Sequence, residues 1–527
     1  MVTQEQSFIE RADLAQNAAG RMVPTTVNGK NQIPYLGVGQ YSPQGRKAGP
    51  PVRSSNQYPE NGDKRVPDLE TALRKCDIRD GMVISNHHHL RDGDSVALMA
   101  LQAAARLGVK DLMWFPSASF PSQKGAIELM EQGVIHHIEG SMNGPLGDYC
   151  TQGKMRGMGV LRSHGGRWQA IQDGEVRIDI AVIAAPTADA FGNADGSHGE
   201  SACGSLGFAQ ADSTYADHVI VVTDSLVPFP CIPWQIQGNN VDYVVEVDSI
   251  GDPSKIVSGT TQITRSPDRL RIAEFVARFL RGSGIMRNGF SFQAGAGGIA
   301  LAFVDYLRSM MKEDGVKAHF VRGGSTKYLV ELLREGLTDY ILDGQTFDLD
   351  GVKSIASDPR HVATSPFTSY NYHGKGNFAS MVDAVVLGAT EVDVNFNANV
   401  VTHSDGRLLH GIGGWQNCLA AGCTILALPS FRDRIPVIVD EVTTLTGPGE
   451  LIDVVATERG IAINPRRQDL VDAVKGSTLP IRPIQEIKAE VERICGGKPA
   501  RPKRGDRPVA IVKWVDGTVL DTIWQVS

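Results

Sequence analysis

The feature that most constrains the fold of this chain is an internal repeat. Three blocks recur in the same order about 200 residues apart: GMVI at 81–84 with GFSF at 289–292, QKGAIELMEQGVIHHI at 123–138 with TKYLVELLREGLTDYI at 326–341, and DAFGNA at 189–194 with DVNFNA at 393–398. Chance similarity between amphipathic helices would explain the second pair but not the ordered series. We therefore interpret the 527-residue chain as two copies of one domain with small insertions.

Each copy alternates amphipathic helices with short apolar strands. In the second copy, Ser266 and Pro267 supply the N-cap and the first residue of a helix. Further helices are predicted over 96–107 and 299–311, and strands over 112–115, 178–185, 218–223, 318–322, 383–387 and 424–428. Near-continuous apolar strands between helices are typical of a parallel sheet that is covered on both faces.

The repeat therefore predicts an α/β fold of two tandem, similar domains with parallel-rich sheets. We place the first domain at 66–262 and the second at 263–500, because a polar stretch over 252–264 separates the copies. Tandem domains of one type place an active site in the cleft between them, at the carboxyl ends of the strands.

The two ends of the chain differ from this repeated body. Residues 1–65 are rich in Gly, Pro, Asn and Arg and have few periodic apolar positions, so we expect an arm that packs along the domains or a partner. Residues 501–527 begin as a basic linker. Asp516-Gly517 then lies between two apolar runs, a pattern typical of a β-hairpin, which we expect to dock on the body.

Composition excludes several classes of protein. The formal net charge of −7 is unsuited to a nucleic-acid binder, which needs a basic face toward phosphates. Seven scattered cysteines do not form a disulfide framework, and we expect most of them to be small buried apolar residues. No stretch approaches the ~18 consecutive apolar residues of a membrane span, and the N-terminus lacks the apolar core of a signal peptide. We expect a cytoplasmic protein.

The first candidate site is the turn NHHHLRDGD at 86–94, which follows an apolar strand of the first copy. His87, His88, His89 and Arg91 would suit a polycarboxylate substrate, because Arg binds carboxylates bidentately and imidazoles donate hydrogen bonds. A metal site is the weaker interpretation, since adjacent histidines point in different directions and no His/Glu pair on a helix matches them. A merely structural or solvated run is a further alternative. We expect no metal.

Two glycine turns before helices are the next candidates. Gly295, Gly297 and Gly298 follow the predicted strand FSFQA, where backbone N–H groups can approach a phosphate or an oxyanion. The spacing is not that of a dinucleotide site, so NAD binding is disfavoured. The second turn contains Gly411, Gly413 and Gly414. We predict that both turns bind a thioester or CoA group, with the first supplying oxyanion contacts; a tight turn without a ligand is the alternative.

The remaining candidates carry arginine, histidine and amide groups. Arg162 and His164 flank a Gly165-Gly166 turn, which predicts an anion-binding loop or, equally, a solvated hairpin. Arg322 ends a predicted strand of the second copy. Asn397 and Asn399 could orient a carboxylate or a thioester carbonyl, although Asn also favours left-handed turns without any ligand.

Several of these motifs together resemble the citrate lyase α-subunit family. They are NAAGRMVP at 17–24 with NGK at 28–30, HHHLRDGD, LRSHGGR, FQAGAGG, and DVNFNANV followed by GIGG. The resemblance runs from the arm to the terminal hairpin. The glycine turns alone are unspecific, whereas the combination is specific.

The resemblance implies a fold, an activity and partners. The fold would be the two-domain CoA-transferase fold, and the activity would move an acyl-carrier thioester from acetate to citrate, giving citryl-carrier and acetate. A β-subunit would then cleave citryl-carrier to oxaloacetate. The thioester would sit on a CoA-like prosthetic group of a small γ-subunit, the acyl carrier protein, so this chain would bind no cofactor of its own. Both hetero-oligomers and homo-oligomers are expected.

One departure from related enzymes bears on the mechanism. CoA-transferases with a glutamate nucleophile carry a Glu-Asn-Gly-type motif after the second strand of the second domain, whereas this chain reads HFVRGGST at 319–326. The citrate lyase type therefore implies direct attack of the citrate carboxylate on the acetyl thioester. The protein would supply positioning and an oxyanion site.

Two other functions remain open at this point. Related folds also support sugar-phosphate isomerisation, and fold alone does not exclude it. A thioester- or sugar-phosphate-sensing module is the non-enzymatic alternative. It would require a DNA-binding segment, which neither the net charge nor the sequence of the arm indicates.

Overall fold

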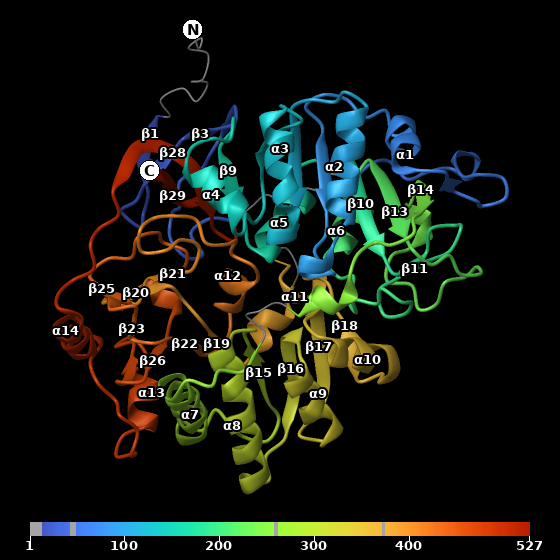
Figure 1. Ribbon diagram of the computed structural model, residues 1–527. Coiled ribbons are helices and arrows are strands. Elements are labelled where there is room, and N and C mark those ends of the chain that lie inside the picture. The colour runs from blue at the N-terminus through green and yellow to red at the C-terminus, as the bar shows by residue number, and fades with distance from the viewer. Residues whose placement is uncertain (1–12, 43–48, 258–261, 372–374, 527) are drawn as a thin grey trace.

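The structure is a computed structural model that describes residues 13–42, 49–257, 262–371 and 375–526. Two α/β halves lie one above the other, each built around its own sheet (Figure 1). The predicted border between them falls partly on residues 258–261, which lie outside the described residues.

The first half contains a seven-stranded parallel sheet. Its order is β5 (Arg65–Val66), β14 (Tyr243–Glu246), β13 (His218–Thr223), β10 (Ile180–Ala185), β6 (Val83–Asn86), β7 (Leu112–Pro116) and β8 (Ile135–Ile138). The accompanying helices are α1 (Leu69–Lys75), α2 (Val96–Arg106), α3 (Ala126–Glu131), α4 (Pro145–Thr151), α5 (His164–Gln172) and α6 (Ala209–Tyr215). Nearly every position of β7, β10 and β13 is buried, which explains the continuous apolar runs in the sequence.

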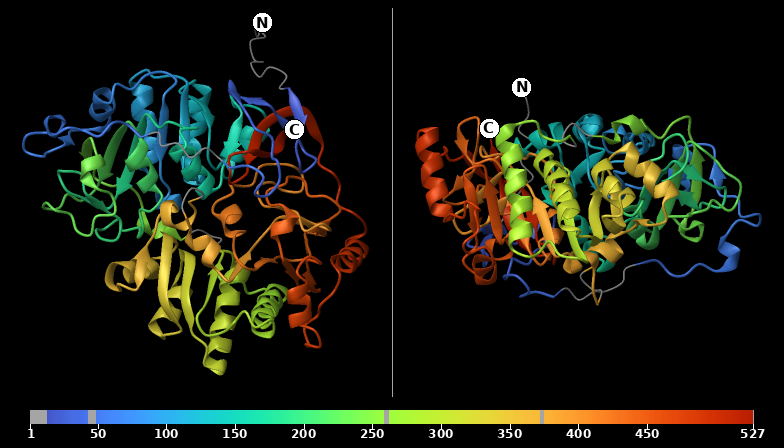
Figure 2. Two further views of the ribbon diagram at one scale, coloured as in Figure 1. Left: turned by 180° about the vertical axis from the view of Figure 1, so that it is seen from behind. Right: turned by 90° about the horizontal axis from the view of Figure 1, so that it is seen from below.

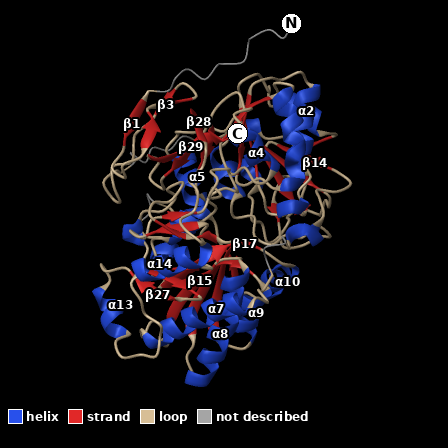
Figure 3. Ribbon diagram, turned by 60° about the vertical axis from the view of Figure 1, so that its left-hand side comes forward, coloured by secondary structure: helices blue, strands red, loops and turns tan. Residues whose placement is uncertain are grey.

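The second half contains an eight-stranded sheet that is parallel except for its last strand. Its order is β18 (His361–Ala363), β17 (Thr338–Thr346), β16 (Ala318–Ser325), β15 (Phe290–Ala294), β19 (Ala384–Leu387), β22 (Thr424–Ala427), β26 (Val454–Thr457) and the antiparallel β27 (Gly460–Ile463). Helices α7 (Pro267–Gly282), α8 (Gly298–Asp314) and α9 (Lys327–Arg334) contact its strands (Figure 3). The remaining helices are α10 (Leu349–Ser357), α11 (Pro366–Ser369), α12 (Trp415–Cys418), α13 (Gln468–Ala473) and α14 (Ile484–Cys495).

The strand orders confirm the internal repeat. The run β14-β13-β10-β6-β7-β8 of the first sheet has the same topology as β26-β22-β19-β15-β16-β17 of the second. A loop detail repeats as well: Asp189 accepts backbone hydrogen bonds from Phe191, Gly192 and Asn193, and Asp393 accepts them from Asn395 and Asn397. The predicted helix start is also confirmed, since Ser266 is the N-cap of α7 and Pro267 its first residue.

The ends of the chain meet on the first half. Strands β28 (Arg504–Lys513) and β29 (Val519–Val526) form the predicted hairpin, and β28 pairs in parallel with β9 (Gly159–Leu161). The arm, which includes β1 (Leu14–Gln16), β2 (Met22–Pro24), β3 (Thr26–Val27) and β4 (Lys30–Asn31), lies beside this hairpin (Figure 2). Val23, Val27, Met158, Ile511 and Val519 belong to one small apolar cluster that joins arm, β9 and hairpin.

The largest apolar core runs across the boundary between the halves. It joins Leu101 and Trp114 of the first half to Trp415 and Ile438 of the second, so the two halves pack as one unit. A separate core lies between the second sheet and its helices. Six of the seven cysteines are buried and none is in a disulfide, as expected. Among the described residues, no helix is long and apolar enough to cross a membrane.

Candidate active site between the two halves

The carboxyl ends of the two sheets face each other, and a histidine of the first half is bound there by a glutamine of the second. His88 follows β6, and its Nε2 lies 3.0 Å from Gln345 Oε1 on β17. The Gln345 amide donates to the His88 carbonyl at 3.1 Å, so its oxygen accepts from His88 Nε2–H. His88 Nδ1 then accepts from the Ser117 hydroxyl at 2.6 Å. The contacts fix a neutral imidazole with its proton on Nε2.

The other predicted histidines gather around His88. The His164 ring lies 5.2 Å from the His88 ring and 4.3 Å from the Phe208 ring, measured between ring centres. His89 stacks at 5.7 Å on His87, which lies 3.8 Å from the Asp212 carboxylate. Burial lowers the pKa of His87 to about 4 and that of His164 to about 3, and it lowers the pKa of His88 and His89 as well. All four imidazoles are therefore neutral at pH 7.

Arg322 supplies a buried positive charge to the same boundary. Its side chain lies on β16, and the residue is 1% exposed. Its polar partners within the described part of the chain are the neutral side chains of Gln293, at 3.0 Å, and Tyr370. Among the residues that the structure describes, none is a hydrogen-bond partner of Arg322 Nε. A buried guanidinium without a carboxylate partner is costly, and an anionic ligand would compensate its charge.

Arg91 reaches the boundary from the histidine turn. It adopts a left-handed backbone conformation with φ of 54°, which turns the chain after His89. Its guanidinium lies 4.4 Å above the ring of Phe347 in the second half and 5.7 Å from the ring of Phe120. Burial lowers the pKa of Arg91 to about 10, so the side chain stays charged at pH 7.

The first glycine turn lines a cavity of about 230 Å³ at the carboxyl end of β15, the strand that carries Gln293. Gly295, Gly297 and Gly298 lie at the start of α8, and Arg269 and Arg432 line the same cavity. Gly297 has an ordinary φ of −75°, and a Cβ there would meet nothing within 4 Å. Its lack of a side chain therefore leaves space rather than relieving backbone strain.

The second glycine turn does not line that cavity; it lets the halves approach each other. A Cβ at Gly411 would collide with Ser141 of the first half, and one at Gly414 would lie 3.7 Å from the His164 ring of the first half and 2.8 Å from the Tyr370 hydroxyl of its own half. The Gly413 carbonyl accepts from the backbone N–H of His164 at 2.8 Å. These glycines bring the second half close to His164.

The Gly165-Gly166 pair is in a helix, so the predicted turn at this position is wrong. Ser163 is the N-cap of α5, and its hydroxyl accepts from Gly166 N–H at 3.0 Å. The glycines are explained by the boundary, because a Cβ at Gly165 would collide with the Asn417 amide, which accepts from Gly165 N–H at 3.0 Å.

The structure does not bring Arg162, Asn397 or Asn399 to the histidine cluster. Arg162 bonds to Glu139 and Glu175, and Lys513 of the hairpin also bonds to Glu175. Asn397 bonds to the Asp393 carboxylate and accepts from Gly449 N–H. Asn399 bonds to Glu391 and Thr402. The side chains of these three predicted site residues are therefore satisfied inside the protein.

Sequence reasoning missed several residues of this boundary. Gln345 could have been considered because it follows the repeated block that ends at Ile341, at the same edge of the sheet as Arg322. Tyr370 and Phe208 lie in segments without helical or strand periodicity, and no signal in the sequence marks them. Among the described residues, no group of His, Cys, Asp or Glu is arranged to hold a metal ion.

Comparison with known proteins identifies the family. The sequence model of the family described as "Citrate lyase, alpha subunit (CitF)" matches residues 62–526. The chain belongs to the citrate lyase α-subunit family. The citrate lyase alpha chain of Klebsiella pneumoniae is 40% identical over 462 residues, covering 87% of this chain and 91% of the relative. That of Escherichia coli is 37% identical over 466 residues, covering 88% and 91%.

Solved structures agree with this family assignment. The α-subunit of citrate lyase from Streptococcus mutans, in complex with citrate, superposes with a TM-score of 0.91 at 38% identity, covering 97% of this chain and all of that one. A Pseudomonas malonate decarboxylase hetero-tetramer contains a chain with a TM-score of 0.61 at 18% identity, covering 84% and 95%. That distant likeness shows the fold alone. The fold is therefore CoA-transferase-like, and the chain is an enzyme of the citrate lyase family.

Proposed function

We propose that the chain transfers an acyl-carrier thioester from acetyl to citrate, releasing acetate and forming a citryl thioester. This is the first step in cleaving citrate to oxaloacetate and acetate. In this proposal the thioester belongs to a CoA-like prosthetic group on a γ-subunit, and a β-subunit cleaves the citryl thioester. The chain itself needs no resident cofactor for the transfer.

The observation that carries the proposal is the buried charge of Arg322. A guanidinium that is 1% exposed and bonded to neutral groups suits a carboxylate ligand, and citrate carries three. Arg91 and the neutral imidazole of His164 lie at the same boundary between the halves, where they would contact further carboxyl and hydroxyl groups. The solved relative from Streptococcus mutans is described in complex with citrate, which supports the same choice of substrate.

The proposed reaction passes through two substitutions at carbonyl carbon. A citrate carboxylate oxygen attacks the acetyl thioester, the C–S bond breaks, and a mixed anhydride and a carrier thiolate form. The thiolate then attacks the citryl carbonyl of the anhydride, acetate leaves, and the citryl thioester forms. Both steps balance without an external acid, oxidant or nucleophile from the protein.

Asp343 of β17, the carboxylate that contacts the carboxyl end of β16, favours this direct route because other groups already bind it. Asp343 accepts from Ser325, Thr346 and the Gln345 backbone, and it lies 3.2 Å from His361 Nε2. A carboxylate held by four groups is a poor nucleophile. The segment after Arg322 reads GGST and contains no acid.

We place the thioester group at the glycine cavity. Backbone N–H groups at the start of α8 could stabilise the thioester oxygen as negative charge develops on it. Arg432 is anchored by bonds to the carbonyls of Ala389 and Thr390, and burial lowers its pKa. Together with Arg269 it gives the cavity a positive potential that suits the anionic groups of a CoA-like arm.

One experiment tests both activity and mechanism. The purified chain is incubated with citrate and acetyl-CoA, and released acetate and citryl-CoA are measured. We expect both products in equal amounts; an isomerase or a sensing module would give neither. In parallel, the chain is treated with acetyl-CoA and then borohydride, which would trap a glutamyl thioester. A reduced glutamate found by mass spectrometry would overturn direct transfer while leaving the overall activity intact.

A further inference from the structure

The imidazole of His164 is held in place by stacking and keeps both ring nitrogens for a ligand. His164 is the first residue of α5 and is partly exposed, whereas His87, His88 and His89 are buried. Its ring stacks at 4.3 Å on Phe208 and at 5.2 Å on His88. Among the described residues, none hydrogen-bonds to the ring nitrogens of His164, although both ring nitrogens of His88 have partners.

Two glycines of the second half lie opposite one edge of this ring. A Cβ at Gly413 would lie 3.9 Å from His164 Nε2, and one at Gly414 would lie 3.7 Å from His164 Cδ2, so larger side chains there would cover the edge. The Cβ at Gly414 would also lie 2.8 Å from the Tyr370 hydroxyl. Tyr370 hydrogen-bonds to Arg322, whose guanidinium lies 5.0 Å from the tyrosine ring. Tyr370 therefore connects His164 to Arg322 across the boundary.

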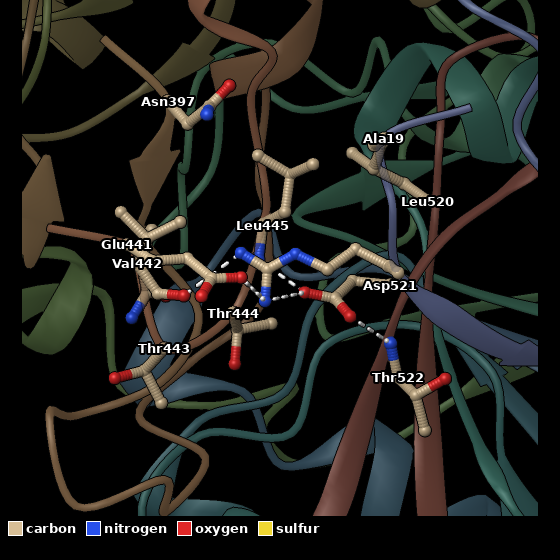
Figure 4. Close-up of polar contacts among 12 residues, drawn as sticks. Ala19, Asn397, Glu441, Val442, Thr443, Thr444, Leu445, Leu520, Asp521 and Thr522 are labelled. Atoms are coloured by element: carbon tan, nitrogen blue, oxygen red, sulfur yellow. Dashed lines mark hydrogen bonds and ion pairs between the residues drawn. The ribbon is translucent and has the colours of Figure 1, made fainter. Parts of the chain in front are cut away.

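Another arginine shows how this chain satisfies a guanidinium without a ligand. Arg21, whose side chain is 12% exposed, donates to the Val442 carbonyl at 3.0 Å. It also lies 3.5 Å from the Asp521 carboxylate and 3.6 Å from that of Glu441 (Figure 4). Arg322 is buried more deeply, but its partners in the described part of the chain are neutral. The difference favours a carboxylate from outside the chain as the partner of Arg322.

Arg322 and His164 differ in charge, which decides what each can bind. Burial lowers the pKa of His164 to about 3, so its imidazole is neutral at pH 7. A neutral imidazole donates from one nitrogen and accepts at the other, which matches a hydroxyl group. A guanidinium only donates, and it binds carboxylates more strongly than a neutral donor does. The pair therefore fits a ligand that carries a carboxylate and a hydroxyl side by side.

We propose that Arg322 and His164 bind the 2-hydroxycarboxylate unit at the centre of the substrate, with its carboxylate on Arg322 and its hydroxyl on His164. The proposal rests on the proposed function in taking citrate as the substrate. It adds which part of citrate each residue binds, and it makes His164 the residue that distinguishes citrate from a tricarboxylate without a hydroxyl group.

Binding citrate by its centre leaves its two carboxymethyl arms available for the transfer. Cleavage of the citryl thioester to oxaloacetate breaks the bond between the carbinol carbon and a methylene group, so the thioester must form on a terminal carboxyl. Arg322 pairs in register with Gln293 of β15. The glycine turn that we assign to the thioester begins two residues, or about 7 Å, further along the chain. A terminal carboxylate of the bound substrate is thereby directed toward the thioester.

The test compares citrate with tricarballylate, which has the same three carboxylates but no hydroxyl group. Binding of each to the full chain is measured by calorimetry without a thioester. We expect tricarballylate to bind roughly 5–150-fold more weakly, because it leaves the buried imidazole without a partner. His164→Phe keeps a ring to stack on Phe208. It should weaken citrate by a similar factor and should not weaken tricarballylate, so that the two ligands bind about equally.

Further variants separate this role from a structural one. His164→Gln should restore part of the preference for citrate, because an amide also donates and accepts. Arg322→Met should weaken both ligands by the same factor, since both carry the central carboxylate. His319→Phe, at an exposed position, is the control and should change neither affinity.

Three results would overturn the proposal: equal binding of the two ligands by the unmodified chain, equal weakening of both by His164→Phe, or no binding of citrate. Release of acetate from acetyl-CoA is measured separately. If acetate is released but tricarballylate binds as tightly as citrate, the role of His164 fails and the proposed function stands. If citrate is preferred in binding but no acetate is released, the proposed transfer fails and the assignment of His164 stands.

Discussion

At the residue scale, burial decides which groups of the boundary carry charge. Four imidazoles are neutral because burial lowers their pKa values, while Arg322 and Arg91 remain charged. The neutral imidazoles can donate and accept hydrogen bonds without competing with the arginines for anions. At this boundary the arginines therefore recognise charge, and the histidines provide shape and hydrogen bonds.

Arg322→Met should weaken citrate binding without unfolding the protein. Loss of a hydrogen bond to a charged group costs about 1.5–3 kcal/mol, so the citrate KM should rise roughly 10–150-fold while the KM for the thioester changes little. Steady-state kinetics with each substrate varied will measure this. Arg162→Met is the control: Arg162 binds two carboxylates, so its loss should lower the free energy of unfolding by about 3–5 kcal/mol. Equal effects on both substrates in Arg322→Met would contradict the assignment.

Gln345→Glu should change the pH dependence of activity and not only the maximal rate. A carboxylate at this position still accepts from His88 Nε2–H but also stabilises the imidazolium, so the acid limb of the rate profile should move to higher pH. Gln345→Leu should lower kcat without that shift, because it removes both bonds to His88. An unchanged pH profile in the Glu variant would show that Gln345 is merely structural.

Stability should fall in acid because of His87. Its folded pKa is about 4, below the ~6.5 of an exposed imidazole, so between these values the unfolded chain binds more protons. The contribution of neutral His87 to the free energy of unfolding is therefore present above pH 6.5. It is lost as the pH falls toward 4, at up to about 1.4 kcal/mol per pH unit. Denaturant unfolding between pH 5 and pH 7 will measure the slope. His87→Leu should reduce it, whereas His319→Gln, at an exposed position, should leave it unchanged.

At the element scale, two glycine turns of similar sequence have different roles. The turn before α8 lines a cavity, and the turn before α12 lets the two halves pack closely. Sequence spacing predicted a ligand at both. The difference depends on what lies opposite each turn: open space at Gly297, and Ser141 of the other half at Gly411.

Gly297→Val should impair catalysis and preserve the fold. The valine side chain would fill part of the 230 Å³ cavity and block approach to the backbone N–H groups, so kcat should fall by about 10²-fold or more. Gly505→Val is the matched control, because Gly505 is exposed at the start of β28 and a Cβ there would make only ordinary contacts, 3.7 Å or more from its neighbours. Normal turnover in Gly297→Val would show that the thioester binds outside this cavity.

At the scale of the whole molecule, the arm closes the structure around the terminal hairpin. Asn17 donates to the carbonyls of Val519 and Leu520, and Asn28 exchanges two hydrogen bonds with Met158 at the start of β9. These bonds join the beginning, middle and end of the sequence. The arm is therefore part of the folded body.

Removing residues 1–42 should cause aggregation or loss of assembly. The deletion would uncover Val519 and its apolar neighbours and leave buried Asp521, whose pKa burial raises, without Arg21. Size-exclusion chromatography with light scattering will measure the outcome, with Val52→Ser, at an exposed position of the arm, as a control. A monodisperse and fully active truncation would contradict this role.

The repeat made much of the fold predictable, while the site depended on contacts between the copies. Apolar runs located β13 at 218–223, and the Ser-Pro pair located the start of α7. Local pattern could not show that His88 meets Gln345, since 257 residues separate them and the orientation of the halves decides the contact. The same orientation explains the glycine at position 165, which lies in a helix and not in a turn. A Cβ there would collide with Asn417 of the other half.

The parallel pairing of β28 with β9 has a consequence for biosynthesis. Strand β9 ends at Leu161, but its neighbour begins only at Arg504, near the end of the sequence. A ribosome must therefore make almost the whole polypeptide before β9 acquires its partner strand. Until then β9 has an unpaired edge, the kind of exposed surface that chaperones protect during synthesis. The three-stranded sheet of β9, β28 and β29 is therefore completed only at the end of synthesis.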